Sequence, residues 1–195
     1  MKNLIITLLV VIFSYPVIAQ ESTLFNGKIE SSGYGGFFTK IGQVNGETGI
    51  FMGGQGAWII NHRIGIGGKG YGIVNKVEIG DLQNVKLEFG CGGALLEYIV
   101  ASDELLHFNV HSMIGAGGVR YAVMDYQKDH SDIDYSDDGF FVLEPGIDLV
   151  LNVNKRFRIG VGTSYRFVNG VDYESLSNSD LNGLSAQVIL KFGVF

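Results

Sequence analysis

The chain of 195 residues is long enough for one domain, and its formal net charge of −6 at pH 7 argues against nucleic acid as a partner. Glycine accounts for 29 residues and proline for only 2, while 46% of the chain is hydrophobic, which excludes collagen and a disordered linker. The single cysteine, Cys91, cannot form an internal disulfide, and we interpret it as a small residue on an apolar strand face.

The N-terminus has the pattern of an export signal. Lys2 supplies a positive charge, residues 4–13 form an apolar run too short to span a membrane as a helix, and the run ends in Val17, Ile18 and Ala19. Small residues in this position are typical of a signal peptidase site. We therefore predict a signal peptide over residues 1–19 and a single outer-membrane β-barrel domain over residues 20–195. Removing the peptide takes away Lys2 and no acidic residue, so the net charge moves from −6 to −7.

Eight segments then show the alternation of half-buried strands: residues 33–43, 48–60, 63–74, 84–100, 105–121, 139–153, 156–167 and 181–195. Every second connection is short, and three of the remaining four are long and polar. Short turns at one end and longer loops at the other are how outer-membrane barrels are built. No stretch has a helical apolar period. The predicted fold is therefore all-β, an eight-stranded antiparallel up-and-down transmembrane β-barrel.

The segment 156–167 shows the two faces most clearly. Its odd positions are apolar, aromatic or Thr, and its even positions are Arg, Gly and Ser, because side chains alternate across a strand. About a dozen residues is enough to cross a bilayer at a tilt. Alternation does not say which face points outward, and a soluble barrel of the lipocalin type would have its apolar face inside.

The polar faces favour the transmembrane alternative. They combine charges with glycines, namely Gly65, Gly67, Gly90, Gly92, Gly146, Gly160 and Gly162. A solvated surface has no steric need for glycine, whereas the lumen of an eight-stranded barrel is only just wide enough for side chains to fill. The opposite faces lack charges along their central stretches: Val85, Leu87, Phe89 and Cys91 on one strand, and Phe141, Leu143, Pro145, Ile147, Leu149 and Leu151 on another. We therefore expect these apolar faces to meet lipid.

The polar faces would then place structural charges in the lumen: Lys86, Glu88, Glu144, Asp148, Arg158 and Arg166. Cross-strand partners must share a face, and the polar face has even residue numbers on both strands of the hairpin of residues 139–167. The numbers of two paired residues should therefore have an even sum. This requires a three-residue loop, either residues 153–155 or residues 154–156. Both registers bring Glu144 within reach of Arg166, and we predict that these two side chains interact, with Asp148 and Arg158 as the next nearest charges.

The last strand carries a resemblance. Val188, Leu190, Phe192 and Val194 alternate with polar or small residues, and the sequence closes on Phe195. This ending resembles the assembly signal of bacterial outer-membrane barrels, and the chain as a whole resembles the small eight-stranded family of the OmpA and OmpX type. The resemblance implies localisation in the outer membrane, contact with membrane lipids and lipopolysaccharide, and recognition of the C-terminal strand by the barrel-assembly machinery, with Phe195 as the signal. Phe195 is in phase with Lys191 and Gly193.

Candidate metal sites are weak. His107, Asn109 and His111 share one strand face, a spacing that arises in any polar-lined strand, and we interpret them as lumen lining. In the acidic third loop, Asp132, Asp134 and Asp138 are weak metal candidates. Residues 134–139 match the first half of a calcium loop, but its twelfth position is Pro145. We expect no cofactor.

The function predicted from these features is structural or surface-interacting, with a plugged polar lumen. One alternative is a narrow pore, which would need the lumen pairs to part. The other is an enzyme that modifies lipid A at the membrane rim. His111 precedes Ser112 directly, but adjacent strand residues face opposite sides, so this histidine cannot activate that serine. We expect no catalytic residue.

Overall fold

The computed structural model describes residues 29–77, 85–123, 138–171 and 176–195. Eight antiparallel strands close into one barrel, with each strand paired to its sequence neighbours and β1 paired to β8. The strands are β1 Ser31–Val44, β2 Glu47–Ile60, β3 Ile64–Ile73, β4 Val85–Val100, β5 Leu106–Val123, β6 Asp138–Asn154, β7 Phe157–Asn169 and β8 Gly183–Val194. The predicted fold class and strand count are confirmed.

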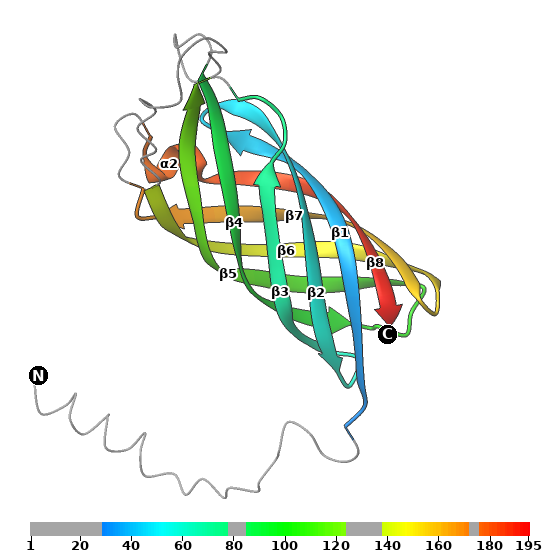
Figure 1. The fold of residues 1–195 in the computed structure, drawn as a ribbon. Helices are drawn as coiled ribbons and strands as arrows, with labels where there is room; N and C mark the ends of the chain where they lie inside the picture. The colour runs from blue at the N-terminus through cyan, green and yellow to red at the C-terminus, as the bar shows by residue number, and fades with distance from the viewer. Residues whose placement is uncertain (1–28, 78–84, 124–137, 172–175) are drawn as a thin grey trace, which may run out of the picture.

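The two ends of the barrel differ, and we name them by their connections. The turn end carries residues 61–63, 101–105 and 155–156 together with Phe195 (Figure 1). The loop end carries the β1–β2 turn and the strand ends that lead into the other connections. At the loop end, β1 and β2 are joined by Asn45 and Gly46, whose φ angles of 52° and 76° are those of a tight hairpin turn. The first turn at the turn end is one residue longer than predicted, because Ile60 pairs with Ile64.

One short helix, α2 (Asn178–Leu181), lies at the loop end before β8. The strand-like pattern predicted from residue 181 therefore begins two residues later. Ser177 caps the helix together with Asp180, whose carboxylate accepts a hydrogen bond from the Ser177 N–H at 2.8 Å. Within the described ranges, no helix has the length and apolar character needed to cross a membrane.

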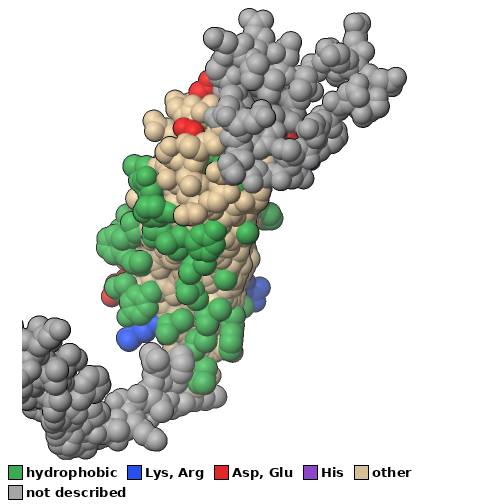
Figure 2. Space-filling model, turned by 90° about the vertical axis from the view of Figure 1, so that its left-hand side faces the viewer, with side chains coloured by type: hydrophobic (Ala, Val, Ile, Leu, Met, Phe, Trp, Pro, Cys, Tyr) green, Lys and Arg blue, Asp and Glu red, His purple; other side chains and the backbone are tan. Residues whose placement is uncertain are grey.

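The outer wall is apolar over most of its height. Figure 2 shows hydrophobic side chains covering the wall from the turn end past the middle, with few toward the loop end. Outward side chains that are about half exposed include Met52, Trp58, Phe108, Val110, Phe141, Ile147, Val161, Phe167, Val188 and Phe192, and Phe37 is more exposed still. This wall matches the lipid-facing band expected for β6 and β7.

The interior has two layers rather than the uniformly polar lumen that was expected. Charged and polar side chains fill the middle and, together with a small hydrophobic cluster, the turn end. The loop end is filled by a hydrophobic core with members from every strand, from the β3–β4 and β7–α2 connections and from α2, including Phe38, Val44, Phe51, Val77, Leu87, Phe89, Met113, Phe140, Val142, Val168, Leu176, Leu181 and Ile189. We call these the charged layer and the apolar layer.

The apolar layer corrects the prediction for β4. Leu87, Phe89 and Cys91 were expected to meet lipid, but all three point inward and are at most 7% exposed. The expected lumen glycines Gly90 and Gly92 lie on the opposite, outer face. The physical reason is that polarity inverts along the barrel axis: toward the loop end the apolar side chains are inside, as they are in a soluble barrel. The side chain of Val85 lies outside the described residues.

Candidate functional site

Glu144 of β6 lies at the centre of the first charge cluster and has no exposed surface. Lys40 of β1 donates a hydrogen bond to its Oε1 at 2.5 Å, and Nζ of Lys69 on β3 lies 3.8 Å from the same oxygen. The hydroxyl of Tyr71 donates to Oε2, and the Lys40 ammonium lies 4.2 Å from the centre of the Tyr71 ring. Because a buried charge is costly unless it is paired, one carboxylate here compensates two buried lysines.

Glu97 of β4 is the centre of a second cluster, closer to the turn end. Lys191 of β8 donates to Oε1 at 3.0 Å, and Nδ2 of Asn109 donates to the same oxygen at 2.8 Å. Oε2 accepts a hydrogen bond from the Tyr34 hydroxyl at 2.6 Å, and that hydroxyl accepts one from Nε2 of Gln55 at 2.8 Å. The carboxylate is thus held by three donors from three other strands.

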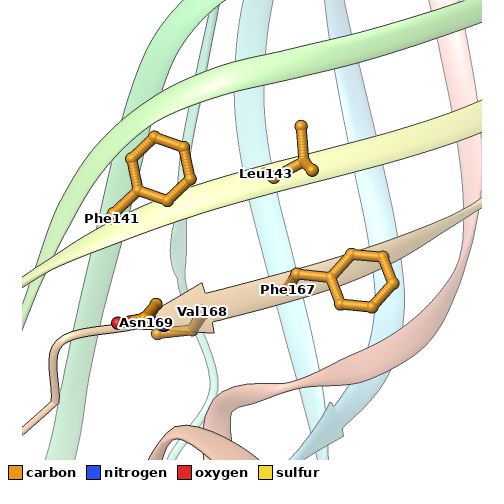
Figure 3. A pocket seen from close by; sticks show the side chains of 5 residues that line it. All are labelled: Phe141, Leu143, Phe167, Val168 and Asn169. Atoms are coloured by element: carbon orange, nitrogen blue, oxygen red, sulfur yellow. The ribbon is translucent and has the colours of Figure 1, made fainter. Parts of the chain in front are cut away.

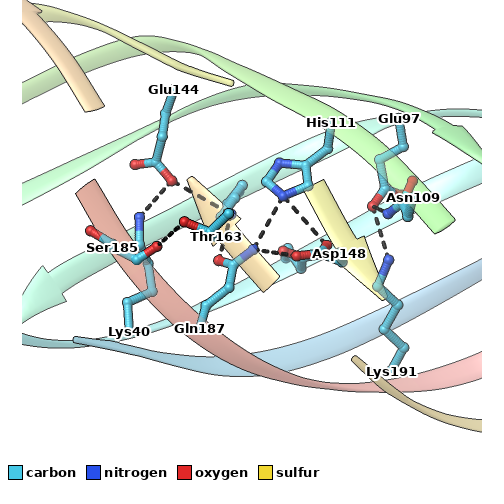
Figure 4. A network of polar contacts seen from close by, with 12 residues as sticks. Lys40, Glu97, Asn109, His111, Glu144, Asp148, Thr163, Ser185, Gln187 and Lys191 are labelled. Carbon is cyan, nitrogen blue, oxygen red and sulfur yellow. Dashed lines mark hydrogen bonds and ion pairs between the residues drawn. The ribbon is translucent and has the colours of Figure 1, made fainter. Parts of the chain in front are cut away.

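Asp148 of β6 is the third acid of the charged layer. Nε2 of Gln187 donates to its Oδ1 at 2.6 Å, and Nε2 of His111 lies 3.4 Å from Oδ2. Oε1 of Gln187 accepts from Lys69 at 3.3 Å, so this amide connects the Asp148 cluster to the Glu144 cluster. Figure 4 shows the acids and their partners converging on the barrel interior from opposite walls.

Glycines make room for these side chains, as the sequence predicted for this part of the lumen. A Cβ at Gly146 would lie 2.6 Å from Cε1 of His111, and a Cβ at Gly162 would collide with Oδ1 of Asp148. Each polar side chain therefore fills the space that a side chain on the neighbouring glycine would otherwise take. This is the small-and-large packing that a narrow barrel requires.

Of the two registers predicted for β6 and β7, the one with its loop at residues 154–156 holds over the body of the hairpin. Asn152 pairs with Arg158 and Leu143 with Phe167, so the positions have an even sum. The connection differs, because Asn154 pairs with Phe157 after a register shift. In place of the three-residue loop, Lys155 and Arg156 form a two-residue turn, and Val153 is an extra, unpaired residue before it.

The predicted interaction between Glu144 and Arg166 is nevertheless wrong. Arg166 is fully buried, but Nε donates to the backbone oxygen of Leu181 at 2.6 Å and Nη2 to that of Gln43 at 3.1 Å. Its guanidinium also lies within 5 Å of the ring centres of Phe51 and Phe89. Arg166 belongs to the apolar layer, where its hydrogen bonds link α2 to the end of β1 at the loop end. Glu144 is satisfied by lysines instead.

The other predicted lumen charges divide between the two faces. Asp148 and Arg158 are inside, and Arg158 lies against the ring of Phe195 at the turn end. Glu88 is on the outer wall, which contradicts the prediction, because β4 has the opposite phase. There it accepts a hydrogen bond from Nε of Arg120 at 2.7 Å. The side chain of Lys86 lies outside the described residues.

The weak metal and catalytic candidates do not come together. His107, Asn109 and His111 line the lumen, but Asn109 binds Glu97 while His111 faces Asp148. His111 points inward and the neighbouring Ser112 lies on the opposite face. Among the residues that the structure describes, no three His, Cys, Asp or Glu side chains are grouped to hold a metal. Asp132 and Asp134, and the side chain of Asp138, lie outside the described residues.

An apolar groove of about 530 Å³ opens on the outer wall near the loop end, lined by Phe141, Leu143, Phe167, Val168 and Asn169 (Figure 3). It lies beside a gap in the β6–β7 pairing next to Pro145, which has no N–H to donate. Its lining continues the apolar wall, so we assign it to the lipid-facing surface.

Several residues of the charged layer were missed by sequence reasoning: Tyr34, Lys40, Gln55, Tyr71, Glu97 and Gln187. Some of them could have been predicted, because an isolated polar residue within an apolar strand is a visible signal in the sequence. Lys40 follows Thr39 and precedes Ile41, and Gln187 stands between Ala186 and Val188. Such a residue in a lipid-crossing strand belongs on the lumen face.

Comparison with solved structures agrees with this architecture. The chain is similar to the N-terminal β-barrel domain of OprF from Pseudomonas aeruginosa, with a TM-score of 0.58 and 10% identity over 85% of this chain and 99% of that one. It is similar to Neisserial surface protein A, with a TM-score of 0.54 and 9% identity over 86% and 99%. It is also similar to the Yersinia pestis attachment protein Ail in complex with a heparin analogue, with a TM-score of 0.50 and 13% identity over 86% and 99%.

No protein-family model and no curated protein sequence matches the chain. At identities this low, the structural likenesses establish the fold alone. The closed strand order and the apolar wall agree with them. By its fold, the chain is a closed eight-stranded β-barrel of the outer-membrane type.

Proposed function

We propose that the protein is an integral barrel with a plugged lumen that serves a structural or surface-interaction role in the outer membrane. The observation that carries the proposal is the filling of the interior. Glu97, Glu144 and Asp148 are each held by donors from other strands and are at most 4% exposed. Above them the apolar layer closes the loop end, with Leu181 of α2 fully buried in it.

The proposed orientation follows from the connections. In outer-membrane barrels the short turns face the periplasm and the longer loops face outward. The turn end would therefore be periplasmic, and the loop end would present its connections to lipopolysaccharide and to partners outside the cell. Residues 1–19 would act as the signal peptide for export. Recognition of the C-terminal strand and Phe195 by the barrel-assembly machinery stays a prediction.

We propose a non-catalytic role for the protein, in preference to the alternative of an enzyme that modifies lipid A. The adjacent His–Ser pair considered above, His111 and Ser112, is split between the lumen and the wall. His111 is engaged by Asp148 and Gln187, so a nucleophile on the outer face has no access to it.

Single-channel recording separates the plugged barrel from the narrow pore. Purified protein reconstituted into a planar lipid bilayer should give no current steps above the bare membrane, because both layers of the interior are filled. A gel-mobility difference between unboiled and boiled samples confirms that folded barrels were added. Stable current steps from folded wild-type protein would favour the pore.

A further inference from the structure

Phe195 is partly buried at the turn end, and its ring packs into the mouth of the barrel. The ring of Phe195 stacks on that of Tyr34, with centroids 5.8 Å apart and an interplanar angle of 26°. The guanidinium carbon of Arg158 lies 3.9 Å from the centre of the Phe195 ring. Phe195 packs against a small buried cluster, separate from the apolar layer, that is formed by Tyr34, Ala57, Ile59 and Ile99.

The geometry of β8 explains this inward position. Phe192 and Val194 point to the outer wall and are 49% and 65% exposed, while Lys191 points inward and is buried. Phe195 continues the inward phase. Gly193 allows β8 to approach β1 closely at this point, because a Cβ there would lie within 2.7 Å of Tyr34. The Gly193 N–H also donates to the Arg156 oxygen at 3.0 Å, which fixes the end of the strand.

The groups next to Phe195 lead directly into the charged layer. Tyr34 donates to Glu97, and Lys191 donates to the same carboxylate. Arg158 is only 8% exposed, and its guanidinium lies against the face of the Phe195 ring. The acid that acts electrostatically on Arg158 is Asp103. A cation against an aromatic face is stabilised by the ring quadrupole, and the contribution grows when water is excluded.

We propose that Phe195 is an internal plug of the turn end: its ring, held between Tyr34 and Arg158, separates the charged layer from the periplasm. This inference rests on the proposed plugged lumen and its orientation. It gives the terminal aromatic residue a role in the finished barrel that is separate from any role during assembly. It also assigns Arg158 the task of holding the plug, through the contact of its guanidinium with the ring.

A cysteine at Ala57 tests the plug. Ala57 is 6% exposed and belongs to the cluster that Phe195 covers. The native Cys91, buried in the apolar layer at the other end, serves as an internal control. Folded Ala57→Cys protein in detergent micelles is treated with a small anionic methanethiosulfonate reagent, and modification of each cysteine is followed by peptide mass spectrometry.

Adding Phe195→Ala should speed modification at position 57 by about tenfold or more, because a site reached only through local opening becomes directly accessible. Cys91 should remain unmodified. The matched control is Phe192→Ala, which removes an aromatic ring from the same strand, stacked on Phe157 at 4.8 Å on the outer wall. This control should leave the rate at position 57 unchanged.

Arg158→Met provides a second route if Phe195→Ala fails to fold, since it loosens the plug and leaves the C-terminal strand intact. It should also speed modification at position 57. Equal rates with and without the plug, or an equal acceleration in Phe192→Ala, would overturn the inference. Failure of the plugged-lumen proposal is a separate result, namely current through the wild-type barrel. The Phe195→Ala barrel should stay non-conducting, because the apolar layer is untouched.

Discussion

Replacing Glu144 by Gln should lower the free energy of unfolding by about 3 to 5 kcal/mol, the usual cost of removing one partner from a buried ion pair. Glutamine keeps the size and one acceptor oxygen but removes the charge. Lys40, at 2.5 Å, and Lys69, at 3.8 Å, would then lose the counter-charge nearest to both of them. Urea unfolding in detergent micelles, followed by tryptophan fluorescence, measures the loss.

Two further variants make this result specific. Glu88→Gln weakens the ion pair with Arg120 on the exposed wall, where the loss should stay below about 1 kcal/mol. In a double-mutant cycle, Glu144→Gln with Lys40→Gln should lose less than the sum of the single variants, since the second change removes the charge that the first left unpaired. Additive losses, or equal losses for Glu88 and Glu144, would contradict the charged layer described above.

Val161→Arg should lower the stability of the barrel by about 2 to 4 kcal/mol or prevent its assembly, because it places a cation at mid-height in the lipid-facing band. Val161 is 50% exposed on the outer wall and pairs with Leu149 and Val188, which are also apolar. The measurement is reversible unfolding in lipid vesicles, with the gel-mobility difference as the test of assembly.

Val153→Arg is the matched control for this substitution. Val153 is equally exposed, at 48%, but lies beside the β6–β7 turn, where a charge reaches the membrane interface. The expected cost there is about 0 to 1 kcal/mol. If both arginines are tolerated equally, the wall at Val161 does not face hydrocarbon.

The strands were predictable because their period is short and local. Alternation over residues 156–167 is visible without any tertiary information, and so is the shortness of the turns. The short helix α2, Asn178–Leu181, was not predicted, because four residues are too few to show a helical period of apolar residues. The rule that paired positions share a face narrowed the register of β6 against β7 to two, one of which is observed.

The phase of β4 was not predictable by the same means, because polarity inverts along the barrel axis. Near the loop end Leu87 and Phe89 face inward while Glu88 pairs with Arg120 outside. Nearer the turn end Glu97 faces inward, in phase with Leu87. A rule that charges lie inside therefore assigns opposite phases to the two halves of one strand. The height of each residue relative to the membrane is needed to choose.

The pairs of side chains that interact within the lumen could not be predicted from the sequence either. Glu144 and Lys40 are 104 positions apart and meet across the barrel, not along a strand pair. Such contacts depend on closure of the sheet and on the stagger of its strands. Cross-strand reasoning placed Arg166 opposite Glu144, yet carbonyl oxygens and two aromatic rings bind that arginine instead.

The lipid-facing wall is tested most directly by the fluorescence of the only tryptophan, Trp58. Its side chain is 53% exposed on the outer face of β2. In vesicles of phosphatidylcholine brominated on the acyl chains near the headgroup, emission should be strongly quenched relative to unbrominated vesicles, while aqueous iodide should quench it weakly. Equal emission in the two lipids, together with efficient quenching by iodide, would mean that the apolar wall does not meet the membrane.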